Sequence, residues 1–380
     1  MKAGWKIKCL GDVAKVSAGN SAPQDKSLFK DGVYPFFRTA DAGRVRFGEI
    51  HKSADYLNDK GIKGLRRYPR GTILFPKSGA STFLNHRVML GVEGCVSSHL
   101  ATIIADTTQI EPRFLLYFLS TVAAQDLIQD HAYPSLNLPT IEGIRIQSPS
   151  LPEQQRIVHI LDEAFEGIAT AKANAEKNLQ NARALFESHL QSVLSQPGKD
   201  WVEMTLESCC EQIFAGGDVP KDHVSQERTP KYSVPIFSNG VKDEGLYGFT
   251  DVARVTKPSI TVSARGTLGF SAIRTEPFFP VVRLIVLIPD ETLIDLSFLY
   301  YTVVGMDFGN TGTSIPQLTV PNFKECKLYF PPLSLQKAIV EKLDDLREET
   351  QRLESIYKQK LAALEALKKS LLHQAFTGEL

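Results

Sequence analysis

The chain has 380 residues, of which 43% are hydrophobic and 23% are charged, and its 43 Lys and Arg balance its 43 Asp and Glu. This length is enough for two domains, and this composition excludes both wholesale disorder and a fibrous architecture. A net charge of zero argues against a protein that coats nucleic acid without selectivity. The sequence has no run of 18 apolar residues and no apolar signal-peptide core, so we expect a cytoplasmic protein.

The neutral sum hides an uneven distribution of charge. Residues 30–90 hold 12 Lys and Arg against 5 Asp and Glu, whereas residues 199–330 hold 12 against 16. The first domain is therefore expected to have a basic face. The second must bind any anionic partner with cations that are sparser along the chain and outnumbered by carboxylates.

Short β-rich runs that alternate with turns predict a mixed α/β domain in each half of the chain, and hence an α+β protein. Each domain also carries one apolar helix, and a helix of about 40 residues, roughly 60 Å long, follows each domain. In chain order, we predict a domain at 1–150 (strands at 71–76 and 99–105, a helix at 112–130), a helical segment at 151–197, a domain at 198–331 (strands at 258–264 and 281–289, a helix at 296–310) and a helical segment at 332–380.

The sequence contains an internal repeat, which is sought first because it determines the architecture. The segment LPEQQRIVHILDEAFEG from Leu151 recurs as LSLQKAIVEKLDDLREE from Leu333, and the same offset of 182 residues carries Gln154 onto Gln336. A constant offset over about 40 residues indicates one helix that is used twice.

The two domains correspond more loosely. Trp5 matches Trp201, the run at 34–38 (YPFFR) matches 234–238 (VPIFS), and the run at 75–81 (FPKSGAS) resembles 262–268 (VSARGTL). The offset drifts between these matches, which indicates insertions in loops.

Both long helices carry apolar side chains at coiled-coil spacing. Small residues in the first helix would face Leu and Tyr in the second, so we infer that the two helices pair within one chain, antiparallel if the halves are related by a pseudo-two-fold axis. The alternative is that each helix only covers its own domain. The predicted pairing residues are Ile157, Leu161, Ala164, Ile168, Ala171, Ala175, Ala182, Leu185, Ile339, Leu343, Leu346, Leu353, Tyr357, Leu364, Leu367 and Leu371.

Motifs for catalysis are missing from the sequence. It has no phosphate-binding loop, dinucleotide fingerprint, H-E-x-x-H, G-x-S-x-G or Cys/His metal pattern. It also lacks the Asn/Asp-Pro-Pro-aromatic run that holds a flipped adenine, since Phe330-Pro331-Pro332 has neither the polar residue nor the aromatic one. We therefore predict a non-enzymatic chain with no catalytic residue, no metal and no cofactor of its own.

Basic and polar side chains in turn-rich segments are suited to DNA, because such side chains contact phosphates and base edges. For each of them an ordinary solvated side chain is the alternative. The glycine turns at 77–80 and 265–269 could likewise cradle a phosphate or simply turn a hairpin. The predicted DNA-binding residues are Arg38, Arg44, Arg46, Arg66, Arg67, Lys77, Ser78, His86, Arg87, Asn239, Lys242, Arg265, Thr267, Arg274 and Arg283.

Two copies of Pro-x-Leu-x-x-Gln-x-x-Ile-Val-x-x-Leu-Asp, at 149–162 and 331–344, precede a C-terminal Gln-Ala-Phe-Thr-Gly-Glu-Leu at 374–380. Together with the weaker Gly71-Thr72-Ile73-Leu74 and Ser78-Gly79, they make the chain resemble the specificity subunits of type I restriction-modification systems over essentially its whole length.

This resemblance implies two target recognition domains, at 1–150 and 198–331, and two conserved helical spacers, at 151–197 and 332–380. Each domain would read one half of a bipartite, asymmetric DNA target, with half-site centres roughly 10 base pairs apart. The implied partners are double-stranded DNA, two modification subunits that bind S-adenosylmethionine and methylate adenine, and restriction subunits that use ATP.

A second hypothesis is a coiled-coil interaction scaffold whose domains bind proteins or sugars. DNA binding with a salt dependence that reflects several phosphate contacts distinguishes the two. A self-contained methyltransferase or nuclease is disfavoured by the missing motifs.

Overall fold

The computed structural model describes residues 4–128, 134–221, 223–306, 308 and 318–380. The chain is α+β and divides into two compact units, Met1–Asn174 with Lys360–Leu380 (unit 1) and Ala175–Gln359 (unit 2). Within the described residues, no helix is both long and apolar enough to span a membrane.

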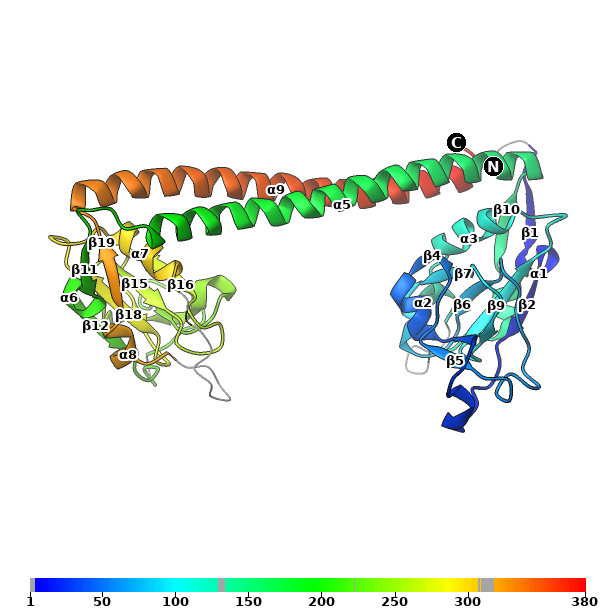
Figure 1. Cartoon of the computed structure of the whole chain (residues 1–380), viewed down its shortest axis with the longest axis horizontal. Helices are drawn as coiled ribbons and strands as arrows, with labels where there is room; N and C mark the ends of the chain where they lie inside the picture. The colour runs from blue at the N-terminus through cyan, green and yellow to red at the C-terminus, as the bar shows by residue number, and fades with distance from the viewer. Residues whose placement is uncertain (1–3, 129–133, 222, 307, 309–317) are drawn as a thin grey trace. The chain divides into compact units, whose positions relative to one another are not determined.

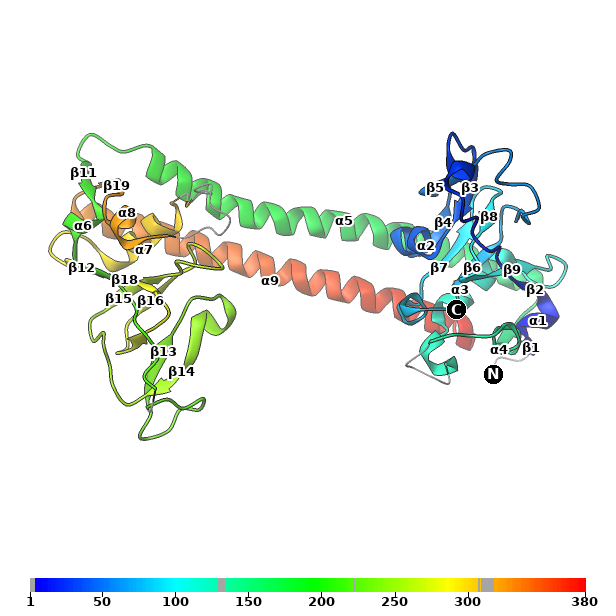
Figure 2. The same ribbon diagram turned by 90° about the horizontal axis from the view of Figure 1, so that it is seen from below.

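Unit 1 is built on a mixed five-stranded sheet and a separate three-stranded sheet. A short antiparallel pair, β1 with β10, joins the two ends of the domain. Figure 2 shows β3 and β5 at the side of the unit away from α3. The elements are β1 (Lys6–Cys9), α1 (Leu10–Val13), β2 (Ala14–Ala18), β3 (Tyr34–Phe37), α2 (Thr39–Val45), β4 (Phe47–Ile50), β5 (Asp55–Leu57), β6 (Ile73–Pro76), β7 (Arg87–Leu90), β8 (Cys95–Val96), β9 (Leu100–Ala105), α3 (Pro112–Thr121), α4 (Leu138–Glu142) and β10 (Arg145–Ser148), with 3-10 turns η1 (Lys26–Phe29), η2 (Ala80–Leu84) and η3 (Ala124–Leu127).

Unit 2 repeats this arrangement with a four-stranded and a three-stranded sheet. The pair β11 and β19 closes the domain as β1 and β10 do, and β13 and β14 again lie away from the unit's apolar helix, α7 (Figure 2). The elements are β11 (Val202–Thr205), α6 (Leu206–Cys209), β12 (Cys210–Ala215), β13 (Val234–Phe237), η4 (Lys242–Gly245), β14 (Leu246–Thr250), β15 (Ser259–Val262), β16 (Ser271–Arg274), β17 (Phe279–Pro280), β18 (Ile285–Pro289), α7 (Leu296–Val304), α8 (Val320–Lys324) and β19 (Lys327–Phe330).

Strand registers show which residues are equivalent in the two units. Phe36 pairs with Cys95 in parallel β3 and β8, and Ile236 pairs with Phe279 in parallel β13 and β17. This register confirms the sequence match of 34–38 with 234–238. Unit 1 has in addition α2 and β4, and β4 adds an edge strand beside β7. This insertion accounts for the largest change in the offset between the domains, which falls from 200 (234 − 34) to 187 (262 − 75) across it.

Two helices of 45 residues follow the domains, α5 (Leu151–Ser195) and α9 (Leu333–Thr377) (Figure 1). The repeated glutamine fixes the start of each. The buried Gln154 side chain donates to the carbonyl of Pro149 at 2.9 Å and accepts the N–H of Glu111, the N-cap of α3, at 2.8 Å. Gln336 makes the same two kinds of bond in unit 2. The repeated motif is therefore the joint between a domain and its long helix.

Within unit 1, the first part of α5 packs antiparallel against the last part of α9. Ile157 belongs to the same buried core as Leu372, and Lys172 Nζ donates to Glu365 Oε1 at 2.7 Å. The helix thus covers its own domain and also pairs with the other long helix.

Within unit 2, the last part of α5 packs against the first part of α9. Leu190 and Leu343 share a buried cluster, and Arg183 Nε donates to Glu354 Oε2 at 3.1 Å. The two helices therefore run antiparallel in this unit too.

The contact seam departs from the predicted one in the second half of each helix. Leu185 and Leu367 are 52% and 47% exposed, so their prediction as pairing residues is wrong. A straight helix has 3.6 residues per turn, so a strict 3-4 alternation drifts off the contact face; the seam instead reaches Phe186 and Lys368, one residue later. Of the other predicted residues, Ile157, Leu161, Ala175, Ala182 and Leu343 are buried, and Ala164, Ile168, Ala171, Ile339, Leu346, Leu353, Tyr357, Leu364 and Leu371 are half-buried.

The two apolar helices are shorter than predicted. α3 ends at Thr121. The helix does not continue because the backbone N–H of Ala124 donates to the side chain of Asn85, Oδ1, at 2.8 Å and not to a carbonyl of the helix. α7 ends at Val304, followed by Gly305 as its C-cap. The predicted ends of both helices, at 129–130 and at 307 and 309–310, lie outside the described residues.

Candidate nucleic-acid interface

In unit 1, four loop segments meet at the end of the five-stranded sheet where β2 and β6 finish and β9 begins. We call this site ledge 1 (Asn20, Arg66, Lys77, Ser78 and His99). The Asn20 amide donates to the carbonyl of Arg66 and accepts the N–H of Arg66, both at 2.8 Å. The N–H of Lys77 donates to the carbonyl of His99 at 3.0 Å, and Ser78 Oγ shares a 2.8 Å hydrogen bond with His99 Nδ1. Arg66 and His99 are exposed. Ledge 1 therefore presents polar and basic groups on loops whose backbone these hydrogen bonds hold in place.

Unit 2 has an equivalent site at the end of the four-stranded sheet where β12 and β15 finish and β18 begins, which we call ledge 2 (Gly217, Asn239, Arg265, Val282 and Arg283). Asn239 ties its loops together, because Asn239 Oδ1 accepts the N–H of Ala264 at 2.8 Å and Asn239 Nδ2 donates to the carbonyl of Val282 at 2.6 Å. Arg265 and Arg283 are exposed. The Asn239 amide is thus occupied in holding the loops that carry the two arginines.

Strand pairing shows which ledge residues are equivalent. Ser98 N–H donates to Asn20, as Val282 N–H donates to Gly217, so His99 and Arg283 hold the same position. The register of β6 with β9 and of β15 with β18 likewise places Ser78 where unit 2 has Arg265. Sequence reasoning matched Ser78 with Arg265 but missed His99, whose significance lies in its contact with Ser78.

The predicted cations of unit 1 fall into two groups. Arg38, Arg44 and Arg67 each form an ion pair, with Asp55, Asp41 and Glu93 respectively. Around Arg46, Arg66 and Lys77, by contrast, the described residues offer no carboxylate within ion-pair distance. The unpaired group keeps its full charge available for an anionic partner.

Arg87 is not a DNA contact, and that prediction is wrong. The side chain is fully buried; it donates to the carbonyls of His86 at 2.9 Å and Val122 at 3.2 Å, and its guanidinium lies 3.5 Å from the centre of the Phe75 ring. Burial lowers the pKa of Arg87 to about 9. The half-buried His86 is affected similarly, since burial and then Arg46 and Arg87 lower its pKa.

Arg274 of unit 2 is also buried, which contradicts its prediction as a DNA contact. Its guanidinium donates to Thr261 Oγ1 at 3.2 Å and to Glu244 Oε2 at 3.0 Å, and lies 3.6 Å from the centre of the Phe237 ring. Burial lowers the pKa of Arg274, against the opposing effect of Glu244. The remaining predicted residues, Lys242 and Thr267, are exposed.

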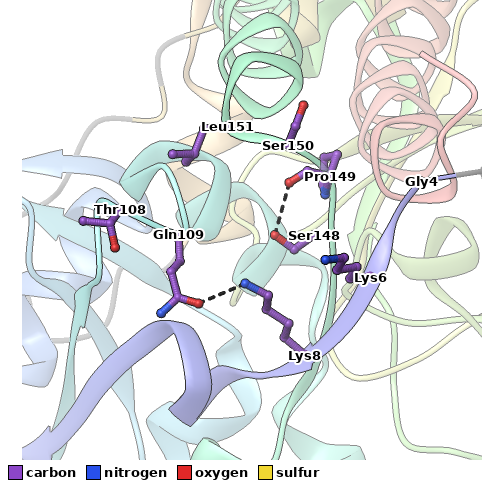
Figure 3. Close-up of a pocket in the computed structure, with 9 residues that line it drawn as sticks. All are labelled: Gly4, Lys6, Lys8, Thr108, Gln109, Ser148, Pro149, Ser150 and Leu151. Atoms are coloured by element: carbon purple, nitrogen blue, oxygen red, sulfur yellow. Dashed lines mark hydrogen bonds between the residues drawn. The ribbon is translucent and has the colours of Figure 1, made fainter.

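A cavity of about 310 Å³ lies beside the start of α5 in unit 1 (Figure 3). Lys8 Nζ donates to Gln109 Oε1 at 2.9 Å, and the carbonyl of Gln109 accepts from Gln154 Nε2 at 3.3 Å. The polar groups of this cavity therefore take part in the joint between domain and helix. In the part of the chain that the structure describes, no three His, Cys, Asp or Glu side chains gather as metal ligands would.

Comparison with known sequences gives one consistent family. The family model for the type I restriction modification DNA specificity domain matches residues 2–180 and again 198–365. A putative type I specificity subunit of Mycoplasma pneumoniae is 31% identical over 342 residues, covering 90% of this chain and 88% of the relative. A second one from that organism is 33% identical over 253 residues, covering 63% and 73%.

Comparison with solved structures gives the same fold. A chain from a study of complex assembly and conformational transition in the type I R-M system superposes with a TM-score of 0.82 at 18% identity, covering 100% of this chain and 99% of that one. The HsdS subunit from Thermoanaerobacter tengcongensis gives a TM-score of 0.63 at 18% identity, covering 100% and 98%.

Proposed function

The chain belongs to the family of type I restriction-modification DNA specificity domains, and on that premise we propose that it reads a bipartite, asymmetric DNA target. The domain at 1–150 reads one half-site through ledge 1, and the domain at 198–331 reads the other through ledge 2. The chain acts in the cytoplasm on double-stranded DNA.

One observation supports the proposal that the target is asymmetric. The same two positions hold Ser78 and His99 in unit 1 but Arg265 and Arg283 in unit 2. A hydroxyl and an imidazole offer different hydrogen bonds to base edges from two guanidinium groups. Two domains of one fold thus read two different sequences.

The proposed role of the chain in the reaction is positioning. It places the target within reach of two modification subunits, which bind S-adenosylmethionine and methylate adenine, and of restriction subunits, which use ATP. Holding reactants in the right geometry contributes to rate without covalent chemistry by the holder.

The test is to express the chain with its modification subunit in a host without methylation and to map methylated adenines across the genome. The proposal requires a split motif, of which only one half changes when residues 198–331 are exchanged for the matching domain of a relative. A continuous motif, or equal change in both halves, contradicts it.

A further inference from the structure

Two consecutive residues of ledge 2 have an unusual backbone. Val282 and Arg283 have φ angles of 53° and 61°. Side chains other than glycine rarely adopt positive φ, and for a branched residue such as valine it is a clear outlier. Such strain persists only where the surroundings hold it, and it concentrates at binding and catalytic sites.

The surroundings of this turn do hold it. Val282 N–H donates to the carbonyl of Gly217 at 2.9 Å, and Arg283 N–H donates to that of Gly216 at 3.1 Å. Asn239 binds the carbonyl of Val282. A Cβ on Gly216 would lie 2.6 Å from the carbonyl carbon of Pro280, so only glycine permits this close approach. The backbone that carries Arg283 is therefore fixed from both sides.

We infer that Arg283 reads a guanine in the half-site of unit 2, held in position by the Val282–Arg283 turn and by Asn239. This inference rests on the proposed function. A phosphate contact needs only a nearby charge, whereas bidentate pairing with guanine O6 and N7 needs a directed guanidinium fork. Arg283 is exposed, and none of the described carboxylates lies within ion-pair distance of it. His99, at the same position in unit 1, is likewise held, by its bond to Ser78.

The test compares methylated motifs of the full chain with its modification subunit for Arg283→Ala, Arg283→Lys and a matched arginine control, Arg228→Ala, whose side chain pairs with Glu276. The inference requires Arg283→Ala to relax one guanine position in the unit 2 half-site by about tenfold or more, with the other half unchanged. Arg283→Lys keeps the charge but not the guanidinium fork, so most of the guanine preference should stay lost. Arg228→Ala should change no position. Selectivity that is unchanged by Arg283→Ala, with a salt dependence reduced by about one phosphate contact, overturns the inference.

The fixed turn is tested separately with Val282→Gly, because glycine tolerates positive φ. Its thermal midpoint should stay within a few degrees of wild type, yet discrimination at the same guanine should fall several-fold as the turn gains freedom. Unchanged discrimination would overturn the role of the strained turn. A wild-type complex that gives no split motif contradicts the proposed function. A split motif whose unit 2 half lacks a guanine contradicts only the inference about Arg283.

Discussion

The side-chain oxygen of Gln336 accepts the backbone N–H of Asp295 at 2.8 Å, and Asp295 is itself the residue that caps α7. Gln154 holds the N-cap of α3 in the same way. The same contact in both copies of the repeat thus ties the first turn of each long helix to the start of a short helix, α3 or α7.

We expect Gln336→Leu to destabilise unit 2 by about 2 kcal/mol, because it removes the hydrogen-bond partner of the buried Pro331 carbonyl and of the half-buried N–H of Asp295. Urea unfolding of the full chain measures this. Lys337→Ala, at the exposed neighbouring position, is the control. Equal stability of the two variants would show that water replaces the lost bonds.

Unit 2 should lose stability in alkaline solution through Tyr301. Burial, followed by the hydrogen bond from the Tyr301 hydroxyl to Asp344, raises the pKa of Tyr301 to about 12. The folded protein holds the Tyr301 proton more tightly than the unfolded chain does. This contribution to stability is therefore complete below pH 10, the ordinary pKa of tyrosine, and is lost as the pH rises through 12. Tyr301→Phe should therefore be about 2 kcal/mol less stable than wild type at pH 8, and the difference should narrow between pH 10 and 12. A difference that stays constant with pH would contradict this.

The corrected seam predicts opposite results for two neighbouring substitutions in α5. Phe186 packs beside the buried cluster of Leu190, Tyr301 and Leu343, so Phe186→Ala should lower the free energy of unfolding by about 2 kcal/mol. Leu185 is exposed, and Leu185→Ala should stay within about 0.5 kcal/mol. Thermal unfolding of both variants measures this. A strict 3-4 alternation would instead make Leu185→Ala the more destabilising of the two.

Arg66 should contribute to DNA binding through charge. Because it is exposed on ledge 1 and lies near none of the described carboxylates, Arg66→Ala should reduce the slope of log binding constant against log salt by about 0.9. Arg70→Ala is the matched control, since Arg70 pairs with Glu49. Fluorescence anisotropy with labelled duplex DNA at several salt concentrations measures both. Equal slopes for the two variants would remove Arg66 from the interface.

Much of the fold could be predicted because the helical repeat is local in sequence. The constant offset between Leu151 and Leu333 located both long helices, and the matches at Tyr34 and Phe75 agree with the strand registers. The insertion of α2 and β4 could not be placed, because only the drift of the offset signals it. The prediction for Leu185 is wrong because a pattern with a 3.5-residue repeat moves off the contact face of a helix with 3.6 residues per turn only after several turns.

The candidate site was less predictable, because exposure depends on partners far away in the chain. In the sequence, Arg87 resembles the other cations of the turn-rich segments. Its burial depends on contacts with Val122 and Phe75, which are not its sequence neighbours. His99 stands alone in the sequence, and Ser78, which fixes it, is 21 residues away.

The antiparallel pairing of Lys6 with Ser148, and of Val202 with Phe330, means that the chain enters and leaves each domain at neighbouring points. A domain bounded in this way can be replaced by in-frame recombination, provided that the incoming sequence supplies two short strands of matching register. Selection can then act on DNA sequence preference and on helix pairing as separate heritable traits.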